Sequence, residues 1–266
     1  MIQLLSPRTV IVILSGVVLS GSFGLNWLVD IANQNPQSPA EHWRSVGLIT
    51  SGIVGLCFWS PFWRLMWRTP VLGRYLERKF APDLNGFWLV KIQSNFPTLK
   101  ALTEDAASKR AADPKKSLEP STHVFVGCLR QGWLDSGLEL YGHDESVLDT
   151  SDTVLFEFRK SDVKHKCSIF WIYKQKNKTV GALDVGVFEG SAMMSIDHSG
   201  QISGTTWNNR NWMKGMNTAG PITMTKIESS PLFGELSPEK CAERAKALLA
   251  PHNARHDRPS EPKPSA

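Results

Sequence analysis

The chain has 266 residues and a formal net charge of +5, which leaves room for one soluble domain of ordinary size beside a membrane segment. So modest a charge gives no reason to expect a nucleic-acid surface, and the four cysteines show neither a CxxC pair nor metal-ligand spacing. The histidines form no HExxH or similar pattern, so the sequence indicates neither a metal site nor a cofactor.

Two uncharged apolar runs near the N-terminus predict a transmembrane hairpin. They are Thr9–Val29 and Ser45–Trp63. Because a helix rises about 1.5 Å per residue, each run spans roughly the 30 Å of a bilayer's hydrocarbon core. A cleavable signal peptide for the first run and a buried core helix for the second remain the alternatives.

The positive charge on the two sides of these runs is unequal. The linker Asp30–Arg44 holds one Arg, whereas a basic segment follows the second run. The positive-inside rule therefore predicts cytoplasmic N- and C-termini and a short external loop. The residues of the basic segment are Arg64, Arg68, Arg74, Arg78 and Lys79.

Small residues recur at every fourth position of both runs, as is typical of closely packed transmembrane helices. They pack either the two helices of one hairpin or helices of different protomers, and the spacing does not choose between these. The predicted packing residues are Gly16, Ser20, Gly24, Gly47, Ser51 and Gly55.

From Trp88 to Ile227 the pattern changes to short runs that alternate between apolar and polar residues. This period of two, broken by turn clusters, predicts about eight antiparallel strands in a closed barrel or a sandwich. We expect an eight-stranded antiparallel β-barrel, a size that can hold one small ligand in its mouth. Phe96–Ser121 interrupts it as a loop or partial helix, and Ser237-Pro238 starts a C-terminal helix.

The predicted fold is thus a membrane-anchored all-β protein with two N-terminal transmembrane helices. Its expected parts are a hairpin with a juxtamembrane segment (1–80), a cytoplasmic ligand-sensing barrel (81–229), and a C-terminal helix with a disordered tail (230–266).

Aromatic, amide and basic side chains are the candidates for ligand binding. Arg130 has the strand parity of Val126 and Cys128, which predicts that it points into the barrel, where it requires an internal carboxylate or a ligand phosphate. Asn reads base edges, Arg engages phosphate and aromatic rings stack on bases. Core packing is the alternative for the rings, and an ordinary polar turn for the Asn-rich stretch. The candidates are Arg130, Trp171, Tyr173, Trp207, Asn208, Asn209 and Arg210.

No pattern identifies a catalytic nucleophile. Asp197, His198 and Ser199 are adjacent in a predicted turn, and neighbours in a turn cannot adopt the geometry of a catalytic triad. We therefore expect a binding protein and not an enzyme.

Several short motifs add a resemblance. Pro82-Asp83-Leu84-Asn85-Gly86-Phe87-Trp88 opens the β-rich region and is followed by Ser94-Asn95. Ile202-Ser203-Gly204-Thr205-Thr206-Trp207 with Asn209-Arg210, then Gly220 before Ile222–Lys226, closes it. Together with the two apolar runs, these motifs resemble the two-transmembrane, β-strand-rich effectors of bacterial cyclic-oligonucleotide-based anti-phage signalling (CBASS). The likeness covers nearly all of residues 9–228, and the Phe96–Ser121 insertion and the C-terminal tail depart from it.

The resemblance implies a location in the bacterial inner membrane and a mechanism. A nucleotidyltransferase partner makes a cyclic dinucleotide on infection, and the barrel binds it. Protomers then oligomerise, and the spans disrupt the membrane before phage can spread. A membrane-tethered carrier of a hydrophobic ligand and a membrane protein-interaction module remain the alternatives.

Overall fold

The computed structural model describes residues 15–16, 19, 47–48, 51–52, 55, 59–79, 81–108, 118–132, 136–142, 148–160, 167–178, 185–197, 199–215, 217–230 and 237–253. The chain divides into two compact units. One comprises Met1–Asp83 with Gly132–Leu134, and the other comprises Leu84–Gln131 with Asp135–Ala266.

The first unit contains the helices α3 (Ser60–Arg68) and α4 (Leu72–Lys79). Proline stands at the start of α3, where its missing N–H costs no hydrogen bond. Thr69 ends the helix by donating its backbone N–H and its hydroxyl to the carbonyl of Met66. The buried indole of Trp67 donates to the carbonyl of Ala81 over 3.0 Å, which ties α3 to the segment after α4.

Within the described residues, no helix combines the length and apolar character needed to cross a bilayer. Much of both predicted spans lies outside those residues, as do Ser20 and Gly24 of the predicted packing set. The described members Gly16, Gly47, Ser51 and Gly55 are helical and exposed. The transmembrane hairpin remains a prediction.

The second unit is built on one antiparallel eight-stranded sheet with the order β3-β2-β1-β8-β7-β6-β5-β4. It confirms the predicted strand number and direction. The first and last strands in the sequence, β1 and β8, are neighbours within it. The strands are β1 (Gly86–Ser94), β2 (Ser121–Gln131), β3 (Ser136–Tyr141), β4 (Leu148–Lys160), β5 (Cys167–Asn177), β6 (Val187–Ile196), β7 (Ile202–Asn208) and β8 (Ala219–Ser229).

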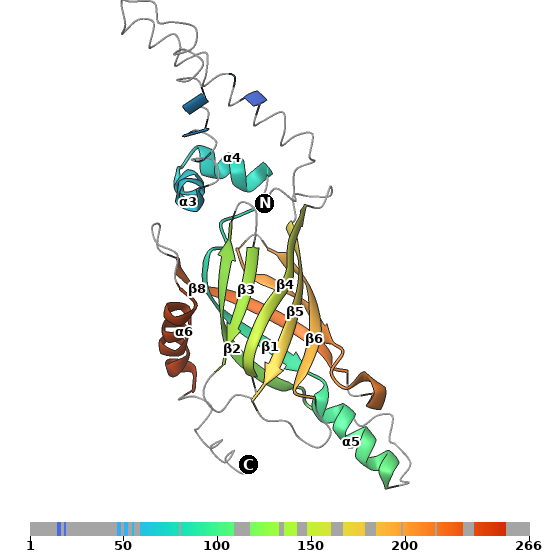
Figure 1. Cartoon of the computed structure of the whole chain (residues 1–266). Coiled ribbons are helices and arrows are strands. Elements are labelled where there is room, and N and C mark those ends of the chain that lie inside the picture. The colour runs from blue at the N-terminus through green and yellow to red at the C-terminus, as the bar shows by residue number, and fades with distance from the viewer. Residues whose placement is uncertain are drawn as a thin grey trace, which may run out of the picture. The chain divides into compact units, whose positions relative to one another are not determined.

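The sheet curls until its two edge strands, β3 and β4, lie side by side (Figure 1), so the barrel is nearly closed. Thr153 joins these edges through its side chain. Its hydroxyl accepts the N–H of Leu138 at 2.9 Å and donates to the carbonyl of Leu138 at 2.8 Å. A bulge between Thr153 and Leu155 interrupts the pairing of β4 with β5 at this point.

The interior holds large apolar side chains, as expected where one face of each strand is turned away from water. Trp88 and Trp171 are the largest fully buried ones. Others that are fully buried are Leu129, Leu138, Ile169, Met194, Ile202, Ile222 and Met224. The barrel is therefore substantially filled by its own side chains.

The outer face of β2 is covered by the helix α6 (Pro238–Asn253) (Figure 1). Ser237 caps this helix, as predicted, because its hydroxyl accepts the N–H of Lys240 at 3.4 Å. Strand β2 is consequently apolar on both faces. The cluster beneath α6 comprises Phe87, Val126, Cys128, Cys241, Ala245 and Leu249.

This cover corrects the predicted orientation of β2. Val126 and Cys128 belong to the outer face beneath α6, whereas Gly127 lies among the interior side chains of Val90 and Leu138. The first part of the Phe96–Ser121 insertion is a helix, α5 (Phe96–Ala107). This agrees with the partial helix that was one of the two structures expected there.

The predicted turn at Asp197 is confirmed. The Asp197 carboxylate accepts the backbone N–H groups of Ser199 and Gln201 at 2.8 and 2.9 Å, and it also accepts the Ser199 hydroxyl. Through these bonds the carboxylate stabilises the turn.

Candidate functional site

One end of the barrel gathers a cation and several aromatic rings. It is the end at which Ser94 of β1 faces Ser121 of β2, and at which β7 leads into β8. We call it the β7–β8 end. The connecting loop contains a short 3-10 helix, η2 (Trp212–Lys214), flanked by left-handed residues at Asn211 and Gly215.

Asn208 and Asn209 fix the start of this loop. Asn208 donates its amide to the hydroxyl of Thr218 at 2.7 Å, and its side-chain oxygen accepts the N–H of Arg210 at 3.2 Å. Asn209 exchanges two hydrogen bonds with the backbone of Glu189, at 2.9 and 2.8 Å. Both amides therefore position Arg210, in keeping with the polar-turn alternative for this stretch.

Arg210 is half-buried and lies close to two aromatic rings. Its guanidinium carbon is 5.4 Å from the ring centroid of Phe96 at the start of α5 and 5.5 Å from that of Phe188 in β6. A guanidinium within about 6 Å of a ring face is attracted by the ring's quadrupole. The two rings hold the cation at the end of the barrel.

His123 of β2 lies on the interior face at the same end, because it pairs with Ile92 while Gly127 pairs with Trp88 further along β1. Its ring is stacked with that of Phe125, with centroids 6.4 Å apart. Burial lowers the pKa of His123 below its ordinary value, and the positive charge of Arg210 lowers it further. The charged form of the imidazole is therefore disfavoured at this position.

This arrangement suits an anion that carries a flat ring. Arg210 supplies a fork of donors that matches phosphate or carboxylate oxygens. The nearby aromatic faces supply stacking surfaces, which bind any base. An anion at Arg210 would also offset the repulsion that now disfavours protonation of His123.

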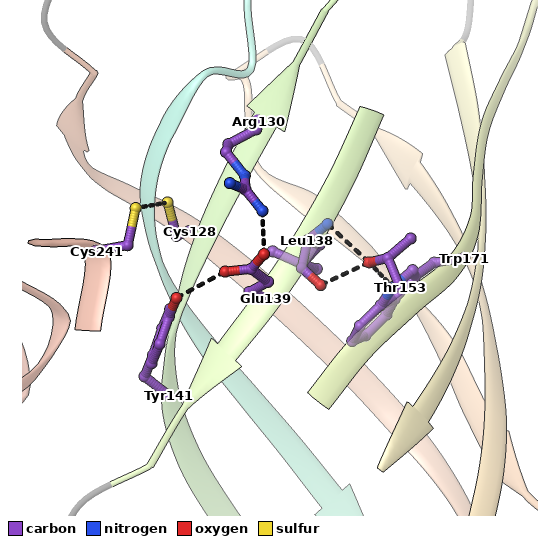
Figure 2. A network of polar contacts seen from close by, with 8 residues as sticks. All are labelled: Cys128, Arg130, Leu138, Glu139, Tyr141, Thr153, Trp171 and Cys241. Carbon is purple, nitrogen blue, oxygen red and sulfur yellow. Dashed lines mark hydrogen bonds and ion pairs between the residues drawn. The ribbon is translucent and has the colours of Figure 1, made fainter. Parts of the chain in front are cut away.

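Trp171 and Tyr173 lie deeper in the barrel, with their ring centroids 4.3 Å apart. The Trp171 indole donates to the hydroxyl of Thr153 at 3.1 Å (Figure 2). The Tyr173 hydroxyl is 3.3 Å from that of Thr206, and burial raises the pKa of Tyr173. Both rings thus pack within the barrel and pair with its own groups.

Arg130 lies on the outer face, and its predicted inward orientation is wrong. It forms an ion pair with Glu139 of β3, and the other oxygen of Glu139 accepts the Tyr141 hydroxyl at 2.7 Å (Figure 2). The required anionic partner is therefore a carboxylate of this chain. Trp207 also faces outward, since it has the opposite parity to the buried Thr206, and it is 46% exposed.

Of the seven predicted binding residues, the structure brings Asn208, Asn209 and Arg210 to the β7–β8 end. The prediction missed Phe96, His123 and Phe188 there. The sequence contains no signal for His123, because β2 is apolar on both faces and its alternation does not say which face is the inner one. The pairing of His123 with Ile92 of β1 shows this only in the structure.

No family model matches the chain. The chain is similar to a protein from Escherichia albertii named CD-NTase-associated protein 15. The two are 26% identical over 185 residues, which are 69% of this chain and 80% of that protein. The name associates that relative with a CD-NTase.

Proposed function

We propose that this protein is an anti-phage effector whose barrel binds a cyclic dinucleotide at the β7–β8 end. The observation that carries the proposal is the half-buried Arg210 held between the rings of Phe96 and Phe188. A phosphate needs the cation, and the bases of a dinucleotide need aromatic faces. The resemblance of the sequence motifs to CBASS effectors implies this ligand class, and the relative's name associates that protein with a CD-NTase.

In this proposal the chain is a sensor, not an enzyme, and it works beside a nucleotidyltransferase that makes the ligand. The two apolar runs anchor it in the bacterial inner membrane with both termini in the cytoplasm. Ligand binding brings protomers together, and the spans then disrupt the membrane. In this proposal the small residues of the two runs let the helices approach closely.

Calorimetry on the full chain in mild detergent tests the ligand site. Arg210→Ala is expected to weaken binding of a cyclic dinucleotide by about 1.5–3 kcal/mol, the range for hydrogen bonds to charged groups. Arg159→Ala is the matched control, because Arg159 also lies over a ring, 4.9 Å from the centroid of Phe170, but pairs with Glu157 and is largely exposed. Arg130→Ala is expected to leave affinity unchanged. Equal losses for all three variants would rule out the β7–β8 end.

The membrane step needs a separate readout. Replacing the small residues of one predicted span with Leu keeps it apolar but prevents close helix approach. We expect such variants to bind ligand normally yet fail to depolarise cells that produce it, as followed with a voltage-sensitive dye. Depolarisation at the parental rate would exclude helix packing as the effector step.

A protein-interaction module is the second candidate, and one surface favours it. The outer faces of β4 to β7 bring exposed apolar side chains into neighbouring register positions, namely Leu155, Ile172, Met193 and Trp207. Plaque assays separate the two candidates. If this surface is the functional one, Met193→Glu abolishes protection and Arg210→Ala does not, whereas the ligand-sensing proposal expects protection to depend on Arg210.

A further inference from the structure

Two cysteines far apart in the sequence meet beneath α6. Cys128 lies in β2 and Cys241 in the first turn of α6, 113 residues later. Their sulfur atoms are 3.1 Å apart (Figure 2), and both side chains are buried. Among the described cysteines none forms a disulfide. The two sulfur atoms would have to approach each other by about 1 Å to reach the roughly 2.05 Å length of an S–S bond.

We propose that Cys128 and Cys241 are a redox-reactive pair whose oxidation to a disulfide fixes α6 to the outer wall of the barrel. The oxidant is hydrogen peroxide. One thiol gives a sulfenic acid as the O–O bond breaks and a first water is released. The second sulfur then attacks the sulfenic sulfur, the S–O bond breaks, and a second water leaves. Each sulfur thus supplies one of the two electrons that reduce the peroxide.

The surroundings favour a disulfide over a metal site. The pair packs against Phe87, Val126 and Leu249, which offer no ligand atoms. The nearby carboxylate of Glu139 is paired with Arg130. A structural zinc site requires four ligands, and no three His, Cys, Asp or Glu side chains gather for a metal anywhere in the described ranges. The two sulfurs can therefore reach each other but do not complete a metal site.

The same burial protects the pair until α6 opens. Burial raises the pKa of the Cys128 thiol, and contact with Cys241 raises it further, so docking disfavours the reactive thiolate of Cys128. Helix ends open locally at lower free energy than a core unfolds. Cys241 is in the first turn of α6, so lifting that turn exposes it. Return of the helix then brings it back against Cys128.

The test uses the full chain in mild detergent with Cys57 replaced by Ser, so that only the described cysteines react. Mild peroxide is expected to remove the mass of two hydrogen atoms, with a tryptic crosslink between the peptides of Cys128 and Cys241. The melting temperature should rise by roughly 10 °C and return to its initial value with a reducing agent, since the disulfide closes a long loop.

Three variants separate this pair from ordinary buried thiols. Cys128→Ser and Cys241→Ser should each abolish the crosslink and the reversible thermal shift, whereas Cys167→Ser should leave both intact. Cys128→Ala serves if the serine at that buried position prevents folding. A crosslink through Cys167, or sulfinic acid at Cys128 and Cys241 with no crosslink, would overturn the proposal.

Discussion

The hydroxyl of Thr153 binds both the N–H and the carbonyl of Leu138, at 2.9 and 2.8 Å. It thus replaces the backbone groups that a neighbouring strand would supply in a closed sheet. The indole of Trp171 donates to the same oxygen at 3.1 Å. One side chain thus satisfies both backbone groups of a residue on the edge of β3. It joins that edge to β4 where a bulge interrupts regular pairing.

Replacing Thr153 with Val should therefore weaken the junction between β3 and β4. The valine has the shape of threonine but no hydroxyl, so three polar groups lose their partner. Because each unsatisfied buried group costs about 1–3 kcal/mol and the site is partly exposed, we expect the free energy of unfolding to fall by roughly 2–3 kcal/mol. Urea unfolding followed by tryptophan fluorescence measures it. Thr153→Ser keeps the hydroxyl and should lose less than half as much; an equal loss would assign the effect to packing.

Ligand affinity should depend on pH through His123. Its pKa in the folded protein lies below its ordinary value because of burial and Arg210, and an anion bound at Arg210 would favour its protonation. Binding of a phosphate then takes up a proton, and affinity should rise as pH falls from about 7.5 towards 5.5, through the ordinary histidine pKa of about 6.5. His123→Gln should remove this rise while retaining affinity at high pH.

The same shift has a consequence for the ligand-free protein. Since the unfolded chain protonates His123 at a higher pH than the folded chain does, stability should fall as pH decreases below about 6.5. The His123→Gln variant should show a shallower decline in the urea midpoint over that range. An unchanged slope would place His123 in a solvent-like environment.

A methyl group at Gly190 should disturb the barrel interior. An added Cβ there would overlap the ring and hydroxyl of Tyr173. We expect Gly190→Ala to cost about 1–3 kcal/mol of unfolding free energy through overpacking. The cost should shrink in a Tyr173→Leu background, which removes the overlapping ring. Gly137→Ala is the matched control, because its Cβ would meet Thr153 at an ordinary 3.7 Å.

Topology can be tested independently of the barrel. The basic residues after the second apolar run place Lys79 on the cytoplasmic side. We therefore expect activity after Lys79 only from a reporter that works in the cytoplasm. A reporter within the linker 30–44 should be active only in a periplasmic format. The opposite pattern would exclude a cytoplasmic sensor.

The strands could be predicted because each shows its own period of two, a local signal that needs no knowledge of the partner strand. The orientation of β2 could not, because Val126 on the outside and Leu129 on the inside are both apolar. What distinguishes the faces is α6, more than one hundred residues later in the chain. Arg130 was assigned to the interior for the same reason, and its partner Glu139 on β3 was not recognised.

The candidate site could also be predicted only in part. Arg210 was identified from its own chemistry and from the amides beside it. Phe96 and Phe188, whose rings hold its guanidinium, are ordinary apolar residues in the sequence, and the fold alone brings them to one end of the barrel. Local composition therefore indicated the cation but not its surroundings.

The pairing of β1 with β8, in which Gly86 faces Ser229, bears on how the domain is made. During synthesis β1 leaves the ribosome early and must wait for β8, so its backbone groups on that side have no partner until almost the whole domain has been translated. Such distant pairings slow folding and expose unpaired strand edges meanwhile. If the apolar N-terminal runs engage a membrane first, each nascent chain completes its barrel while already held apart from its neighbours, with less opportunity for β1 to join a strand from another copy.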